Sequence, residues 1–369
     1  MKHFIITNRS IISKNGREYI NPNGKEAAGE NLRFGSFDSA EYLSKKDSAA
    51  AITLYPDAPA PVKSDPVTVN APSPYTKADI IVPEEALFGS ARLFTELYKI
   101  MVSKQGGDLL FFIHGFCNDL DGALESICQM EEKYIREGSP IKHIVCFTWP
   151  AMGKMLRYRD DAKDAELSGL TLARCYLMLI DYFRQLFISD KDNPALDPCG
   201  NNIHLLAHSM GNRVLESMML ELTRQKGNNI TALFREVILA ASDVDWQVFE
   251  EPRVFYNLTN ICQRVTVYFN TCDKALFVSE TTKNAYNRLG KYGFRALNKL
   301  PSHIYSVDCS AVEDEKGFDN RFVEHAYFKG SPAVVKDITE VLNGRNAENF
   351  IPALRVAIPG NAVQYRIKI

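Results

Sequence analysis

Several features that would assign a class at once are missing from this sequence. The eight cysteines are scattered, with no C-x-x-C pair and no Cys/His cluster at the spacing of a zinc site. No apolar run approaches the length of a membrane-spanning helix, since CYLMLIDYFRQLFI is interrupted by Asp181 and Arg184. The opening residues MKHFIITNRS hold too short an apolar stretch for a signal peptide and no small-residue cleavage site. We therefore expect no integral membrane segment, no metal, and a cytoplasmic protein with reduced thiols.

An excess of charge of either sign is also absent. The formal net charge is −2, so no broad field attracts nucleic acid or an anionic membrane. The apolar share of 46% and the charged share of 24% are ordinary for a globular protein, and 369 residues can bury a full core. We expect a globular protein without a nucleic-acid partner.

Composition divides the chain into three parts. Residues 1–85 hold strand-like pieces and then a stretch with seven prolines at 56–84, which predicts an extended strap. Residues 86–345 form the expected core, and 346–369 have the pattern of a strand and turn tail. The first part is expected to complete the main sheet with extra strands. If the chain forms an oligomer or binds a protein partner, we expect the contact to lie in this part.

From residue 108 onward, short apolar runs alternate with segments of helical periodicity. Runs that are apolar on both faces are typical of parallel strands covered by helices on each side. The pattern therefore predicts an α/β fold with a doubly wound, mostly parallel sheet of at least six strands. The runs are DLLFFIHG, HIVCFTW, NIHLLAH, EVILAAS, RVTVYFN and HIYSVDC.

Ser209 lies in LLAHSMGNRV, between the strand NIHLLA and the helix NRVLESMMLEL. Strand, tight turn and helix are the context of a nucleophile elbow, which holds a serine hydroxyl at the carboxyl edge of a sheet. The turn needs small residues two positions before and after the serine; Gly211 meets this need and Ala207 replaces the usual first glycine. The alternative is a serine that only caps a helix.

A serine nucleophile needs a base, and in α/β-hydrolase folds the base follows the serine in the chain. Downstream of Ser209 the histidines are His303 and His325. His303 opens the strand HIYSVDC and so lies at the amino edge of the sheet, on the wrong side. His325 follows that strand and precedes a final helix, so we predict that it is the base. A surface or capping histidine is the alternative.

The base needs an orienting carboxylate, and two strand ends offer one. Asp273 follows the strand just before the one that leads to His325, which is the usual origin of the acid in this fold. Asp243 follows an earlier strand and stays open as an alternative acid. Asp245, two residues on, is assigned to a pocket wall or a structural salt bridge.

An oxyanion hole needs two backbone N–H donors beside the nucleophile. Met210, the residue after the serine, supplies one in this prediction. The loop after LLFFI supplies the other from Phe116, because Gly115 permits a close approach. A simple turn is the alternative for this His-Gly pair. His114, Gly115 and His208 are also expected to line the substrate pocket.

Five segments of the chain together resemble the α/β-hydrolase superfamily: FIHGF, FTWPAMG…YRDDAKDAELSG, LLAHSMGNRVL, CDKAL and EHAYF. They are similar, more narrowly, to a bacterial group of α/β-hydrolases of unknown function, over about residues 108–343. The resemblance implies a triad from the serine of the elbow, the aspartate of the D-[KR]-A-L segment and the histidine of the H-x-Y-F segment. These match Ser209, Asp273 and His325. The N-terminal hundred residues are largely outside the resemblance.

The insert at about 150–169 also matches that group and is expected to form part of a cap over the serine. Trp149 and Tyr158 would then lie near the pocket. For the run RDDAKDAE within it, the favoured interpretation is a solvated charged face.

The sequence thus predicts a serine hydrolase that cleaves a carboxylic ester of a small molecule or lipid through an acyl-enzyme, with no cofactor. The same residues would serve a thioesterase, an amidase or an acyltransferase. A non-catalytic binding or effector protein on a hydrolase fold is the alternative of a different class.

Overall fold

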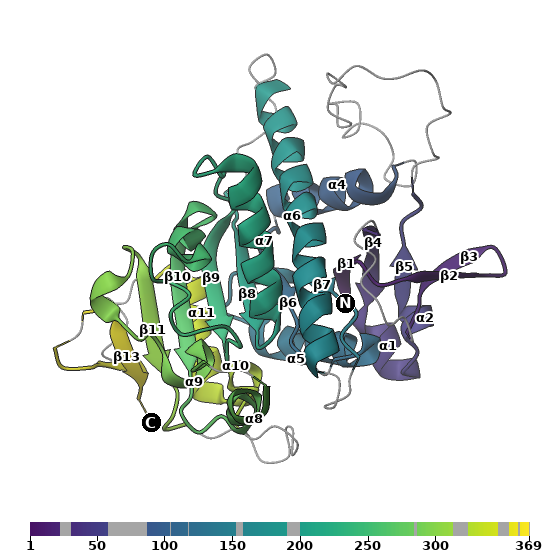
Figure 1. Ribbon diagram of the computed structural model, residues 1–369. Helices are drawn as coiled ribbons and strands as arrows, with labels where there is room; N and C mark the ends of the chain where they lie inside the picture. The colour runs from purple at the N-terminus through teal and green to yellow at the C-terminus, as the bar shows by residue number, and fades with distance from the viewer. Residues whose placement is uncertain are drawn as a thin grey trace.

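The computed structural model (Figure 1) describes most of the chain. The predicted proline-rich strap lies outside them from residue 58 on. The described ranges are 1–22, 31–57, 87–103, 105–116, 118–152, 158–189, 200–283, 286–312, 324–345, 354–360 and 362–368.

One sheet of eleven strands, in the order β12-β13-β11-β10-β9-β8-β6-β7-β1-β4-β5, runs through the described residues. All neighbours from β13 to β1 pair in parallel, and only the outermost pairs β12/β13, β1/β4 and β4/β5 are antiparallel. The predicted α/β class with a mostly parallel sheet is confirmed. The strands are β1 (Lys2–Thr7), β4 (Arg33–Asp38), β5 (Ile52–Leu54), β6 (Asp108–Ile113), β7 (Ile141–Thr148), β8 (Ile203–His208), β9 (Phe234–Ala240), β10 (Cys262–Phe269), β11 (Ile304–Asp308), β12 (Arg355–Ala357) and β13 (Gln364–Ile367).

Helices cover both faces of this sheet (Figure 1). Because successive strand residues point to opposite faces, β6 contributes Leu109, Phe111 and Ile113 to one core and Leu110 and Phe112 to the other. Helices α4, α6 and α7 pack on the first core, and α5 and α11 on the second. The helices are α1 (Ser39–Lys45), α2 (Ser48–Ala51), α4 (Gly89–Val102), α5 (Leu120–Tyr134), α6 (Tyr158–Ser189), α7 (Gly211–Lys226), α8 (Lys274–Lys283), α9 (Leu289–Tyr292), α10 (Tyr327–Gly330) and α11 (Pro332–Leu342), with 3-10 turns η4 (Val254–Asn260) and η5 (Leu297–Lys299).

The order of the strands fixes where a ligand can bind. From β6 the chain crosses to β7 on one side and then returns to β8 on the other side of β6. At such a switch point the loops after the two central strands diverge, and they leave a crevice at the carboxyl edge of the sheet. The loop after β8 carries Ser209, and the loop after β6 carries Gly115.

Both terminal segments extend the main sheet. Strands β1, β4 and β5 lengthen it at one edge, while the hairpin of β2 (Ile11–Lys14) and β3 (Arg17–Ile20) pairs separately. At the other edge, β12 and β13 place the C-terminal tail beside β11. The tail is held by a buried ion pair, in which Arg355 donates through Nε and Nη2 to the two oxygens of Asp337 at 2.6 and 2.7 Å.

No helix in the described ranges is both long and apolar enough to cross a membrane. Each of the six cysteines described there carries a free thiol. They are Cys128, Cys146, Cys175, Cys262, Cys272 and Cys309.

Candidate active site

Ser209 occupies a strained turn between β8 and α7. Its φ of +53° lies in the left-handed region, which is uncommon for a residue with a side chain and typical of a nucleophile elbow. The turn also explains the small residue two positions later. A Cβ at Gly211 would lie 2.6 Å from the backbone oxygens of Ile113 and His114, so only glycine fits against the end of β6.

The side chains of Ser209, His325 and Asp273 form one chain of hydrogen bonds. Ser209 Oγ lies 2.9 Å from His325 Nε2, and His325 Nδ1 lies 2.7 Å from Asp273 Oδ2. The carboxylate can only accept, so Nδ1 carries the proton and Nε2 is free to accept the serine hydroxyl. The three side chains are almost fully buried. The structure therefore brings the three predicted residues together.

Asp273 and His325 are each held by the backbone around them. Asp273 directly precedes α8, and its second oxygen accepts from the N–H of Leu276 at 2.9 Å, which caps that helix. The loop of His325 is fixed by Tyr327, whose hydroxyl donates to the carbonyl of Tyr268 and accepts from the N–H of Ala241, both at 2.8 Å. The imidazole is thus anchored to the ends of β9 and β10. This tyrosine belongs to the H-x-Y-F segment, but the sequence alone predicts no role for it.

His208 lies against the back of His325. Its ring packs on the rings of His325 and Phe328 at centroid distances of 4.8 and 4.6 Å, and its Nε2 donates to the carbonyl of His325 at 3.2 Å. Burial, with smaller contributions from His325 and Lys329, holds the pKa of His208 well below its ordinary value. A neutral His208 therefore supports the loop that carries the candidate base.

The loop after β6 closes directly on the serine. A Cβ at Gly115 would lie only 2.8 Å from Cβ of Ser209, so this glycine is required for the close approach. Phe116 follows it, and Met210 follows the serine at the N-cap of α7. The two residues predicted to supply oxyanion donors therefore lie next to Ser209: Met210 adjoins it in the chain, and Phe116 lies in the loop that approaches it.

The ring of His114, which precedes Gly115 in this loop, is stacked on the ring of Trp149. Their rings lie 5.3 Å apart at an interplanar angle of 5°, and both are fully buried. The indole Nε1 of Trp149 donates to the carbonyl of His114 at 2.9 Å, and the backbone N–H of Trp149 donates to its Nε2 at 3.1 Å. Burial lowers the pKa of His114 to about 3, so the ring is neutral at physiological pH. Both residues are predicted to lie near the substrate pocket. Their contacts with each other support the loop after β6.

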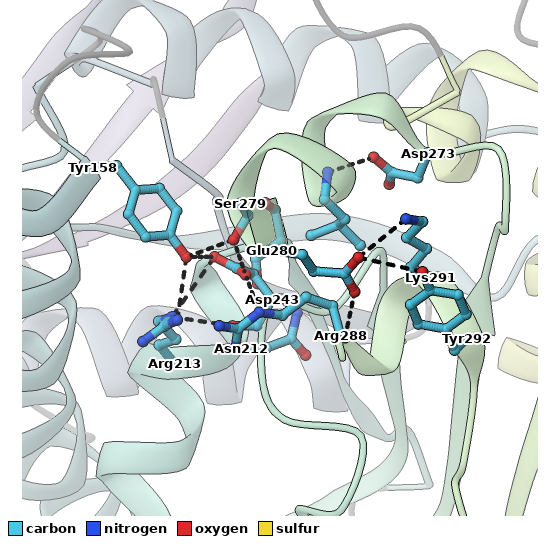
Figure 2. Close-up of polar contacts among 12 residues, drawn as sticks. Tyr158, Asn212, Arg213, Asp243, Asp273, Ser279, Glu280, Arg288, Lys291 and Tyr292 are labelled. Atoms are coloured by element: carbon cyan, nitrogen blue, oxygen red, sulfur yellow. Dashed lines mark hydrogen bonds and ion pairs between the residues drawn. The ribbon is translucent and has the colours of Figure 1, made fainter. Parts of the chain in front are cut away.

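The alternative acid, Asp243, lies in a separate buried cluster (Figure 2). One oxygen accepts from Tyr158 at 2.5 Å and the other from Ser279 at 3.0 Å. Two guanidinium groups complete the cluster: Nε of Arg288 lies 3.4 Å from Oδ1, and Nε of Arg213 lies 3.6 Å from Oδ2 and donates to the backbone oxygen. Of the two candidate acids, Asp273 is therefore the one bonded to the imidazole. Of these four partners, only Tyr158 is predicted from the sequence to lie near the pocket.

The insert predicted at 150–169 is described only in part, because 153–157 lie outside the described residues. From Tyr158 onward it forms the first turns of α6. The ring of Tyr158 packs edge-on against Phe116 at 5.5 Å, which places it beside the loop after β6. Asp245 forms an ion pair with Arg253 at 3.1 Å, in line with the salt-bridge interpretation. Within the described parts of the chain, no group of three or more His, Cys, Asp or Glu side chains is placed to hold a metal ion.

A mostly parallel sheet with helices on both faces, and a serine on a strand–turn–helix corner at its carboxyl edge, is the architecture of an α/β hydrolase. The chain belongs to the family described as alpha/beta hydrolase of unknown function (DUF900), whose model matches residues 90–345. The resemblance drawn from the motifs is thereby confirmed. An uncharacterized protein of Nostoc sp. (strain PCC 7120) is 24% identical over 332 residues, which are 73% of this chain and 80% of that protein. No solved structure matches the chain significantly.

Proposed function

We propose that this chain is a serine hydrolase that cleaves carboxylic esters. The single observation that carries the proposal is the continuous hydrogen-bond chain from Ser209 through His325 to Asp273, at 2.9 and 2.7 Å. Those distances lie within the range expected of a nucleophile, its base and an orienting acid. Membership of an α/β-hydrolase family supports hydrolysis as the reaction class.

In the first half-reaction, Ser209 Oγ attacks the acyl carbon while its proton moves to Nε2 of His325. Asp273 holds the Nδ1–H and stabilises the imidazolium that forms. The imidazolium then protonates the leaving alkoxide, the alcohol departs, and an acyl-enzyme remains. In the second half, His325 takes a proton from water, the hydroxide attacks the ester carbon, and Ser209 Oγ recovers its proton as the acid is released.

The tetrahedral intermediates carry a negative oxygen, and two backbone N–H groups would bind it. We assign these donors to Phe116 and Met210, which flank the serine. One such donor is typically worth about 3 kcal/mol in the transition state. The steps use only groups of this chain and water. Small-molecule and lipid esters are both within the proposed substrate class.

A panel of p-nitrophenyl esters of increasing acyl length tests the proposal. We expect turnover of the short-chain esters by the wild type and a loss of at least about 10³-fold in Ser209→Ala. Ser217→Ala is the matched control, because this half-buried serine lies on α7, away from the triad, and its hydroxyl donates to the carbonyl of Glu166. Turnover that persists in Ser209→Ala, or a folded wild type that cleaves no ester, would contradict the proposal.

A further inference from the structure

Arg9 has a position that the proposed reaction does not explain. It follows the end of β1, lies outside the residues that match the family, and is only 1% exposed. Burial lowers the pKa of its guanidinium to about 10, so it is still a cation at neutral pH. Taking a cation out of water into the interior costs free energy, so its contacts there must compensate for the lost hydration.

The guanidinium of Arg9 joins two strand ends to the loop after β6. Its Nε donates to the hydroxyl of Thr148, the last residue of β7, at 2.9 Å. Its Nη2 donates to the backbone carbonyl of Asn118 at 3.1 Å. Since β7 lies between β1 and β6 in the sheet, the side chain reaches across β7 to the loop that closes on the serine.

The side chain of Asn118 in turn contacts two successive peptide groups of the loop. Its amide Nδ2 donates to the carbonyl of Gly115 at 3.2 Å and to that of Phe116 at 3.4 Å. Nδ1 of His114 also donates to the carbonyl oxygen of Gly115, at 3.0 Å. His114 can donate there because its other nitrogen accepts from Trp149. The carbonyl of Gly115 and the N–H of Phe116 belong to one planar trans peptide and point in opposite directions. Two donors that hold the oxygen therefore fix the direction of the N–H.

We propose that Asn118 and Arg9 are positioning residues that aim the N–H of Phe116 at the oxyanion. Asn118 acts on the peptide itself, and Arg9 acts through Asn118 by holding its carbonyl. The inference rests on the proposed function, because it concerns the donor assigned to Phe116. It also gives the N-terminal strand a part in the active site.

Asn118→Ala tests the first step. We expect kcat to fall about 10- to 100-fold with KM within about threefold, since a misdirected donor loses part of the 10²- to 10³-fold that one oxyanion donor supplies. Affinity for phenylboronic acid, which forms a tetrahedral adduct on the serine, should fall in proportion to kcat. Asn202→Ala is the control: Asn202 contacts Asp108 at the opposite edge of the sheet and should leave both values unchanged. Asn118→Asp, which keeps the shape but replaces the donor by an oxygen, should lower kcat further.

Arg9→Lys tests the second step, because a lysine cannot make both contacts of the guanidinium fork. We expect kcat of Arg9→Lys to fall by about 5- to 30-fold. The double variant of Arg9→Lys with Asn118→Ala should have a kcat within about threefold of that of Asn118→Ala alone, because the effects of two residues that act in series are not additive. Arg355→Lys, another buried arginine, should lower stability but leave kcat unchanged.

The outcomes separate the two proposals. If the wild type turns over esters and Asn118→Ala and Asn118→Asp keep kcat and boronate affinity within threefold of it, the positioning role is wrong and the hydrolase proposal stands. Fully additive losses in the double variant would overturn the action of Arg9 through Asn118. A folded wild type that neither cleaves esters nor binds phenylboronic acid would overturn both.

Discussion

Asp243→Asn is the substitution that separates a structural carboxylate from a catalytic one. The side chain is 2% exposed, and its charge is shared by Arg213 and by Arg288, which is itself buried. Asparagine keeps the shape but removes the charge, so Arg288 is left without its ion pair in the interior. Breaking a buried ion pair from one side typically costs about 3–5 kcal/mol. The hydroxyls of Tyr158 and Ser279 also lose a charged acceptor.

The assay combines urea unfolding with kcat per folded molecule on the best p-nitrophenyl ester. For Asp243→Asn we expect the free energy of unfolding to fall by about 3–5 kcal/mol and kcat to change by less than about tenfold. Asp273→Asn is the matched variant. It should lower kcat by about 10³- to 10⁴-fold, because an amide no longer holds the imidazole in the required tautomer, with under about 2 kcal/mol of lost stability.

The opposite pattern would exchange the roles of the two carboxylates. If Asp243→Asn unfolds like the wild type and loses about 10³-fold in kcat while Asp273→Asn is nearly as active as the wild type, the orienting acid is Asp243. The hydrogen bond between Asp273 and His325 would then be a contact without a catalytic role.

Three further predictions concern stability and the elbow. Burial raises the pKa of Asp161 to about 7, above its unfolded value of about 4. Between these two pH values only the native state holds this proton, so the free energy of unfolding of the wild type falls as the pH rises through that window. Asp161→Asn should therefore gain up to a few kcal/mol on the wild type at pH 8 and little at pH 4 in thermal unfolding; an equal gain at both would contradict this assignment. Gly211→Ala should abolish turnover or folding, since its Cβ would meet two backbone oxygens at 2.6 Å, whereas Gly200→Ala, with nothing within 4 Å, should be neutral in the same assays. Tyr327→Phe removes two hydrogen bonds and should lower the free energy of urea unfolding by about 2 kcal/mol, together with kcat; an unchanged midpoint would show that the hydroxyl does not anchor the His325 loop.

The parallel sheet and the corner at Ser209 could be predicted because each is encoded locally. Continuous apolar runs report strands buried on both faces, and the structure divides β6 between two cores in alternation. A small residue at 211 after an apolar strand reports the tight turn. The contact of Ser209 with His325 followed from chain order in the fold, since the ends of parallel strands meet at one edge.

Long-range polar contacts could not be predicted in this way. Arg9 meets Asn118 across 109 positions, and nothing in the neighbourhood of either residue records the other. The charged run RDDAKDAE illustrates the same limit. Arg159, Asp160 and Lys163 are exposed as expected of a solvated face, but Asp161 is fully buried and accepts from the N–H of Met152 at 3.1 Å. Periodicity locates a helix face, but tertiary packing decides which charges it covers.

The proposed reaction requires the hydroxyl of Ser209 to be a nucleophile activated by His325. A fluorophosphonate probe reacts with such a serine, and peptide mass spectrometry then locates the adduct. We expect one phosphonylated residue, Ser209, labelled at a rate that falls at least about 10³-fold in His325→Ala and is unchanged in Ser217→Ala. A folded wild type that takes up no probe, or an adduct on any residue other than Ser209, would contradict it.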